Sequence, residues 1–230
     1  MIDHVRDLAS LREATERLLA ATGKLDNAGV TEQSRLPGWS RGHVLAHLSR
    51  NADALVNILE GRPMYVSAEA READIERDAS RPLDIQLADI RDSDARFRQA
   101  ADAPADWSRT VTMRNGVTDV AARLPFRRLI EIELHHVDLD IGYELEDLPE
   151  SFTGREIEFL TERFSGHPDV PSLVLTAADG RQWRTGGTGD ATRLAVNGSP
   201  AALLGWLAGR GAKGADLETG GAPLPPLPPL

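Results

Sequence analysis

The feature that most constrains the fold is the spacing of apolar residues within residues 1–149. In four long segments they recur every three or four residues, which is the spacing of one buried face of an α-helix. Residues 23–39 and 102–118 are expected to be loops, the second with a short extended stretch. A shorter charged helix is expected after Ser67. Long helices joined by loops predict an up-and-down four-helix bundle. The long helices are expected over 3–22, 40–59, 83–101 and 127–143.

The pattern changes after Leu148-Pro149, where short apolar runs between turn signals replace the long helical segments. The fold class is therefore predicted to be α+β, with a four-helix bundle over residues 1–149 and a small α/β domain over residues 150–230. The tail PLPPLPPL is too rich in proline for helix or sheet and is expected to lie extended on the surface. Turns are expected at 178–180, 186–189 and Asn197-Gly198. Helices are expected over 153–164 and 199–209, and strands over 172–177, 181–185 and 192–196.

Composition excludes several classes of function. Asp and Glu outnumber Lys and Arg by 36 to 26, and a net charge of −10 without a basic stripe argues against nucleic-acid binding. The chain has no cysteine, so sulfur chemistry would need a small-molecule thiol. The charged N-terminus lacks the apolar core of a signal peptide, and no apolar run approaches the roughly 18 residues that cross a bilayer. We therefore expect a cytoplasmic protein.

The segment 127–143 carries a candidate pair of metal ligands. Glu131 and His135 are four residues apart, which places both side chains on one face of a helix, one turn apart. The earlier segment GHVLAHLSRN offers His47, with His43 one turn before it. His47, Glu131 and His135 would form a two-histidine, one-carboxylate set with an open position, as catalytic zinc sites do. The same ligands also suit iron or another divalent metal.

Each of these polar residues also has a simpler interpretation. An E-x-x-x-H pair is common on helices, and a histidine there is usually packed or exposed. Asp138 and Asp140 are expected to face solvent or cap neighbouring groups, and the charge run 69–77 to form a solvated face. Arg210, in the turn LAGRGAKG, would bind an anionic substrate or compensate a helix C-terminal dipole, and its position alone favours the second role.

Four stretches in order make the chain recognisable: LPGWSRGHVLAHLSRNADAL, RPMYVSAEAREADI, EIELHHVDL and AGRGAKG. They resemble the mycothiol-dependent maleylpyruvate isomerases, within the broader DinB-like family of metal-binding four-helix bundles. Residues 81–120 and the proline-rich tail carry little of the resemblance. At the matching positions, the resemblance implies that His47, Glu131 and His135 bind zinc and that Arg210 is the family's arginine in the second domain.

The resemblance implies an isomerase of gentisate-type aromatic catabolism that uses zinc and mycothiol, a cysteine-containing pseudodisaccharide thiol. The metal would lower the pKa of the thiol, so that the thiolate forms near neutral pH. The thiolate would add to the cis double bond of maleylpyruvate, the resulting single bond would rotate, and elimination would release fumarylpyruvate. Arg210 would be the catalytic and substrate-binding residue that holds a carboxylate or stabilises the enolate. Tyr65 would line the substrate pocket or serve packing.

Two other functions stay open. A DinB-like mycothiol S-transferase acting on another electrophile would use the same metal ligands. A non-catalytic metal-dependent binding protein would have a closed site with a fourth protein ligand, for which His43 is the candidate. For an isomerase, His43 and His136 would only neighbour the site. The expected partners are a small-molecule substrate and a low-molecular-weight thiol, with no nucleic acid, no membrane and a monomeric state.

Overall fold

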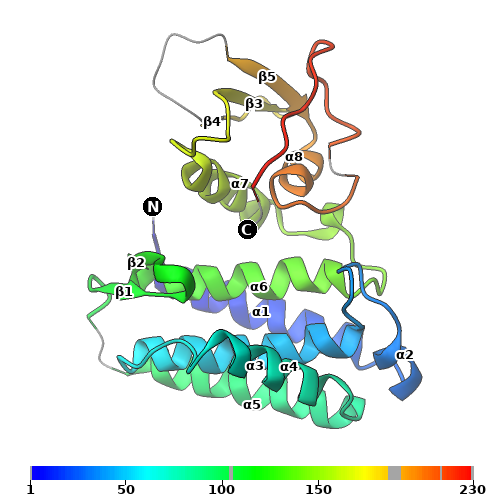
Figure 1. Cartoon of the computed structure of the whole chain (residues 1–230), viewed down its shortest axis with the longest axis vertical. Coiled ribbons are helices and arrows are strands. Elements are labelled where there is room, and N and C mark those ends of the chain that lie inside the picture. The colour runs from blue at the N-terminus through cyan, green and yellow to red at the C-terminus, as the bar shows by residue number, and fades with distance from the viewer. Residues whose placement is uncertain (1, 104–105, 186–192, 213, 229–230) are drawn as a thin grey trace. The chain divides into compact units, whose positions relative to one another are not determined.

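The computed structural model describes residues 2–103, 106–185, 193–212 and 214–228. The chain divides into two compact units, Met1–Tyr143 and Glu144–Leu230. The division falls before the change of pattern at Leu148-Pro149, so residues 144–149 belong with the second unit. The predicted α+β fold class is confirmed, because a helix-rich first unit is followed by a unit built on a small sheet (Figure 1).

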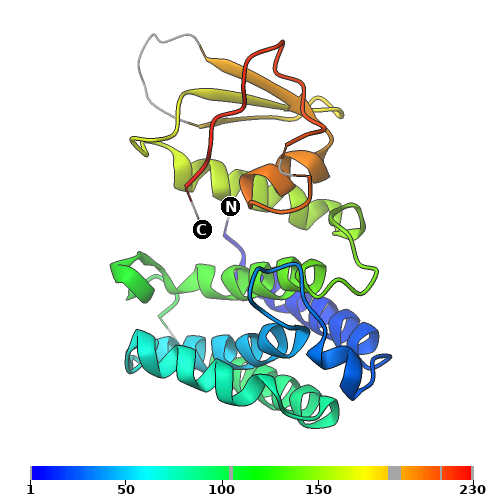
Figure 2. The same ribbon diagram turned by 45° about the vertical axis from the view of Figure 1, so that its right-hand side comes forward.

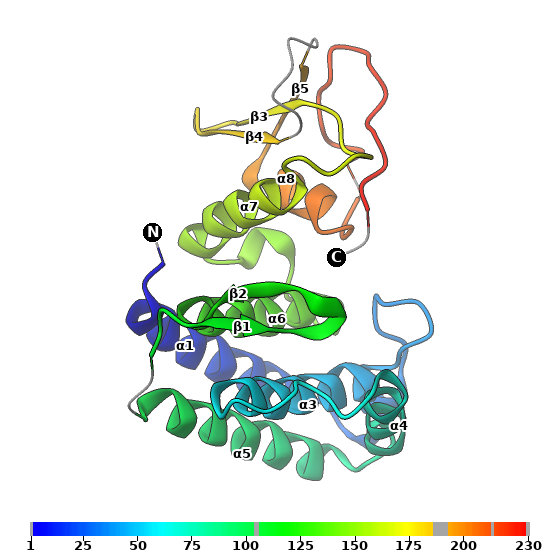
Figure 3. The same cartoon turned by 60° about the vertical axis from the view of Figure 1, so that its left-hand side comes forward.

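The first unit is a bundle whose longest helices, α1, α3, α5 and α6, run side by side (Figures 1 and 3). α3 packs against α5, α4 and α6, and α1 packs against α6. Apolar residues spaced along each helix fill the interior, among them Leu11, Leu45, Ile90 and Ile132, all fully buried. Its helices are α1 (His4–Thr22), α2 (Asn27–Thr31), α3 (Arg41–Leu59), α4 (Ala68–Ala79), α5 (Leu83–Asp102) and α6 (Leu124–Asp138).

Side-chain caps set where these helices begin. Ser40 accepts a hydrogen bond from the backbone N–H of His43 at the start of α3. Ser67 caps α4 in the same way, through the N–H of Ala70. α1 ends at Gly23, whose N–H donates to the Leu19 carbonyl.

Two predictions for the first unit were wrong. The helix expected over 127–143 ends at Asp138, because Asp140 and Gly142 have φ angles of 55° and 84°, outside the helical region. The loop expected over 23–39 contains the short helix α2, which Asp26 caps through the N–H of Gly29.

The second predicted loop is mostly a hairpin. Strands β1 (Thr110–Thr112) and β2 (Thr118–Val120) pair antiparallel through the 3₁₀ turn η1 (Arg114–Gly116). A further 3₁₀ turn, η2 (Ala121–Arg123), leads from the hairpin into α6. The extended stretch expected in this region is therefore confirmed, and it folds back on itself.

In the second unit, helices α7 and α8 cover one face of a three-stranded sheet (Figure 2). The strand order is β4-β3-β5, with β3 antiparallel to β4 and parallel to β5. Leu173, Leu175 and Ala177 alternate along β3 as its buried positions. The elements are η3 (Leu145–Asp147), α7 (Glu150–Phe164), β3 (Leu173–Ala177), β4 (Gln182–Thr185), β5 (Leu194–Gly198) and α8 (Pro200–Leu207).

The turn predicted at Asn197-Gly198 was wrong, because both residues lie in β5 and pair with the end of β3. Asn197 also exchanges backbone hydrogen bonds with Glu218. The turn predicted at 186–189 lies outside the described residues. Within the described ranges, no helix is both long enough and apolar enough to cross a membrane.

Candidate metal centre

Three side chains from two packed helices of the first unit meet at one point. His47 comes from α3, and Glu131 and His135 come from successive turns of α6. The Glu131 Oε2 atom lies 3.0 Å from His47 Nε2 and 3.2 Å from His135 Nε2. Two zinc ligands at bond lengths of about 2.0–2.2 Å and a tetrahedral angle are about 3.4 Å apart. A small widening of the group would therefore fit one divalent cation.

Asp138 fixes the orientation of the His135 ring. Its Oδ2 atom lies 2.8 Å from His135 Nδ1, and the Asp138 side chain is 1% exposed. A proton held on Nδ1 leaves the Nε2 lone pair directed at Glu131 and His47, which is how carboxylates prepare histidines for metal binding. Of the two alternatives predicted for Asp138, facing solvent was wrong, because the side chain is buried and contacts a neighbouring residue. Asp140 does lie at the surface, where it pairs with Arg35.

The electrostatics of the group favour the ligand states of Glu131 and His47, but not that of His135. Burial raises the pKa of Glu131, but hydrogen bonds to His135 and His47 outweigh it and hold the pKa well below its ordinary value. Burial lowers the pKa of His47. Burial also lowers the pKa of His135, but Asp138 and Glu131 outweigh this effect and the net shift is upward. An ionised Glu131 beside a neutral His47 suits metal binding.

His43 and His136 do not join this group. His43 Nδ1 lies 2.7 Å from Ser40 Oγ at the start of α3, and its Nε2 lies 3.1 Å from Glu76 Oε2 on α4, so both ring nitrogens already have partners. His136 is buried and stacks on the Tyr143 ring, with ring centroids 3.9 Å apart. Within the described residues, the candidate metal group therefore has three protein ligands.

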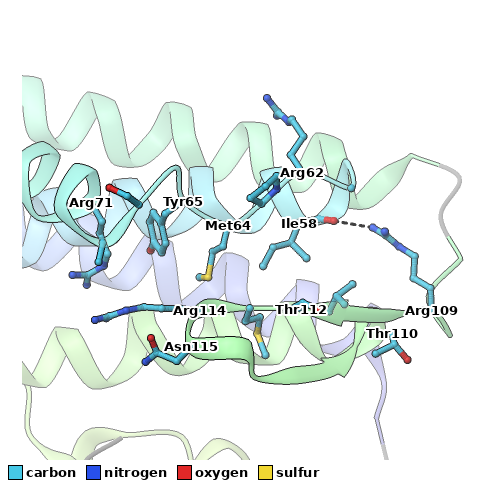
Figure 4. A pocket seen from close by; sticks show the side chains of 16 residues that line it. Ile58, Arg62, Met64, Tyr65, Arg71, Arg109, Thr110, Thr112, Arg114 and Asn115 are labelled. Atoms are coloured by element: carbon cyan, nitrogen blue, oxygen red, sulfur yellow. Dashed lines mark hydrogen bonds between the residues drawn. The ribbon is translucent and has the colours of Figure 1, made fainter.

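A cavity of about 650 Å³ lies beside the three-residue group. Its walls are the end of α3, the connector to α4, the start of α4 and the β1–β2 hairpin (Figure 4). Tyr65 lines the cavity. Arg71 lines it too, and its Nη2 atom lies 3.2 Å from His47 Nδ1, which links the cavity wall to the candidate metal group.

The sequence analysis did not identify Arg71 as a residue of the site. It lies in the charge run 69–77, which was interpreted as a solvated face, yet its side chain is only 10% exposed. The remaining candidate, Arg210, lies in the second unit just after α8, between Gly209 and Gly211. Its Nη1 atom donates a hydrogen bond of 2.9 Å to the Ala208 carbonyl. This contact satisfies a carbonyl at the helix C-terminus.

Comparison with known proteins identifies a family for most of the first unit. Residues 11–140 match the family described as the mycothiol maleylpyruvate isomerase N-terminal domain. No curated protein sequence matches the chain. A crystal structure of the mycothiol-dependent maleylpyruvate isomerase superposes with a TM-score of 0.86 at 29% identity, covering 97% of this chain and 96% of that one.

A second crystal structure, of a histidine-to-alanine mutant of the mycothiol-dependent maleylpyruvate isomerase, gives a TM-score of 0.85 at 29% identity. It covers the same shares, 97% of this chain and 96% of that chain. The family match spans more than half of the chain and includes all three residues of the candidate metal group. The chain therefore belongs to the mycothiol maleylpyruvate isomerase family.

Proposed function

We propose that this protein is a zinc- and mycothiol-dependent cis–trans isomerase that converts maleylpyruvate to fumarylpyruvate. The observation that carries the proposal is the group of His47, Glu131 and His135 beside a cavity, in a chain of this family. The group supplies three ligands from the protein, so a tetrahedral cation would keep one position for an exogenous ligand.

The chain's own residues prepare that site. His47, Glu131 and His135 would hold the cation, and Asp138 keeps the His135 ring in the required orientation. When bound, a divalent cation there lowers the pKa of a thiol, so that the thiolate forms near neutral pH. The side chains of His47 and His135 are 7% and 11% exposed and that of Glu131 is 31% exposed, so the group is partly open to an exogenous ligand.

The reaction needs no oxidant and no net proton. The mycothiol sulfur forms a bond to one carbon of the cis double bond, and the electron pair moves to the conjugated carbonyl oxygen, giving an enolate. The carbon–carbon bond is then single and rotates. The enolate electrons return, the carbon–sulfur bond breaks, and the thiolate leaves behind the trans double bond. Arg210 is proposed to hold a substrate carboxylate or stabilise the enolate, and Tyr65 to contact the substrate.

A non-catalytic protein with a structural metal is less well supported. A structural zinc site is closed by a fourth protein ligand. His43, the natural candidate on α3, has its ring nitrogens beside Ser40 and Glu76 instead. An S-transferase acting on another electrophile would need the same metal ligands, so the substrate assay below must separate it from the isomerase.

The test measures conversion of maleylpyruvate by the zinc-loaded protein with and without mycothiol. We expect fumarylpyruvate to form only when both metal and mycothiol are present, with the thiol recovered unchanged. A matched reaction with glutathione in place of mycothiol controls for non-specific thiol addition. Conversion at the same rate without any thiol would refute the proposal, and a stable thioether product would favour the transferase.

A further inference from the structure

The cavity beside the candidate metal group has an unusual charge. The whole chain has a net charge of −10, yet none of the residues that line the cavity is acidic. Four of the lining residues are arginines: Arg62, Arg71, Arg109 and Arg114. A cavity whose charged side chains are all positive favours negatively charged ligands.

Two of these arginines have structural roles. Arg109 Nη2 donates hydrogen bonds to the carbonyls of Ile58 and Leu59, at 2.9 and 2.6 Å, and so closes the C-terminal end of α3. Arg62 forms an exposed ion pair with Glu60. Both guanidiniums are therefore already engaged by groups of the protein itself.

The other two arginines gather at the opposite end of the cavity, around Tyr65. Figure 4 shows the side chains of Arg71 and Arg114 reaching toward the hydroxyl end of Tyr65. The Arg71 guanidinium carbon lies 5.8 Å from the centroid of the Tyr65 ring. Burial raises the pKa of Tyr65, which keeps its hydroxyl protonated and able to donate a hydrogen bond, although the charges of Arg71 and Arg114 oppose that shift.

These two arginines differ in their existing partners. Arg71 pairs through Nη1 with Glu72, at 2.5 Å, and approaches His47 Nδ1 through Nη2. Arg114 lies in the hairpin turn and is exposed, and it forms no ion pair with any acidic residue in the described ranges. Arg114 is therefore the cation most available to an incoming anion, and Arg71 is the one nearest the metal group.

We propose that Arg114 and Arg71, together with the Tyr65 hydroxyl, bind one carboxylate of a small dicarboxylate substrate at this end of the cavity. The proposal rests on the proposed function and names the residues that recognise its substrate. A guanidinium presents paired N–H donors that match a carboxylate. The sugar part of mycothiol offers hydroxyl groups and no carboxylate, so the two arginines recognise maleylpyruvate rather than the thiol.

The test compares Arg114→Gln and Arg71→Gln with Arg91→Gln, a matched control on the exposed surface of α5 outside the cavity lining. For Arg114→Gln we expect KM for maleylpyruvate to rise about 10- to 100-fold, the usual effect of losing a hydrogen bond to a charged group. KM for mycothiol and the zinc content should stay within twofold. Arg114→Lys should recover part of the loss, because it restores the charge without the paired donors.

A second readout separates this proposal from the proposed function. Binding of maleate, a dicarboxylate with the same cis geometry, is measured by calorimetry on the zinc-loaded protein without mycothiol. Weaker maleate binding in Arg114→Gln and Arg71→Gln, but not in Arg91→Gln, would support the carboxylate site even if the wild-type protein failed to isomerise maleylpyruvate. Unchanged maleate binding and unchanged KM for maleylpyruvate in both cavity variants would overturn it, whatever the isomerase assay shows.

Discussion

His135 and Asp138 are joined on α6 by a 2.8 Å contact between Nδ1 and Oδ2, in a part of the bundle that excludes solvent. The contact decides which ring nitrogen carries the proton, and therefore which one is free to bind a cation. It also raises the basicity of the ring. The first two predictions follow from this pair.

Asp138→Asn should weaken zinc binding by about 10- to 100-fold, because an amide no longer holds the His135 ring by a charged contact. Zinc affinity is measured by competition with a chromophoric chelator. The matched control is Asp140→Asn, two residues later, where the side chain is 53% exposed and pairs with Arg35. Equal zinc affinity in the Asp138→Asn variant and the wild type would contradict the role given to Asp138.

The pH dependence of zinc binding should report the same pair. The pKa of His135 is raised above its ordinary value, and a protonated ring cannot bind a metal, so affinity should fall as the pH drops through that raised pKa. Asp138→Asn removes one interaction that raises the pKa, so its loss of affinity should begin at lower pH. Zinc titrations between about pH 5 and 8 would show the shift. A shift to higher pH would mean that a group other than His135 controls the loss of zinc affinity at low pH.

The two histidines of α3 should respond differently to substitution. His47→Ala removes a proposed ligand, so zinc binding should weaken and isomerase activity should disappear while the helical circular dichroism survives. His43→Ala should keep zinc and lose about 1 kcal/mol of unfolding free energy, because it removes a helix cap beside Ser40. Full activity of a metal-free His47→Ala protein would refute the zinc mechanism.

The helical bundle and the candidate metal group could be predicted from the sequence, because both depend on residues that recur at the spacing of one helical turn. The four-residue spacing of Glu131 and His135 places both on one helix face regardless of what packs there. His47 needed one more step, namely that α3 and α6 face one another in a bundle.

The residues that were missed depend on distant parts of the chain. Asp138 is buried at the last residue of α6, and no local pattern in the sequence distinguishes it from Asp140, which is exposed. In the sequence, Arg71 is one charged residue within a polar run. It lines a cavity only because the β1–β2 hairpin, which is distant in sequence, forms another wall of that cavity. At Asn197-Gly198, pairing with β3 overrode a strong turn signal.

Gly42 should be intolerant of a side chain. An added Cβ would lie 2.0 Å from the Ala79 carbonyl oxygen at the end of α4, closer than any real Cβ contact, so α3 and α4 must separate. Gly42→Ala should cost about 1–3 kcal/mol of unfolding free energy in urea titrations. Gly29→Ala, in α2, is the control, since its Cβ would meet only the side chains of Leu25 and Asp26, at 3.4 Å or more. Equal stability of the two variants would contradict this close packing.

Arg210→Ala separates two roles for the arginine that follows α8. If Arg210 stabilises negative charge on the substrate, turnover should fall roughly 100-fold with no change in bound zinc, as when one donor to a developing oxyanion is removed. If its role is only the hydrogen bond from Nη1 to the Ala208 carbonyl, the variant should lose about 1 kcal/mol of unfolding free energy. Its turnover should then stay unchanged at temperatures where the protein is folded.

Arg210→Lys distinguishes charge from geometry, because lysine keeps the charge but cannot donate two parallel hydrogen bonds to a carboxylate. We expect turnover to fall in both variants, less in Arg210→Lys, with zinc content and unfolding measured on the same samples. Wild-type turnover in Arg210→Ala would remove this residue from the proposed mechanism and leave it as a helix cap.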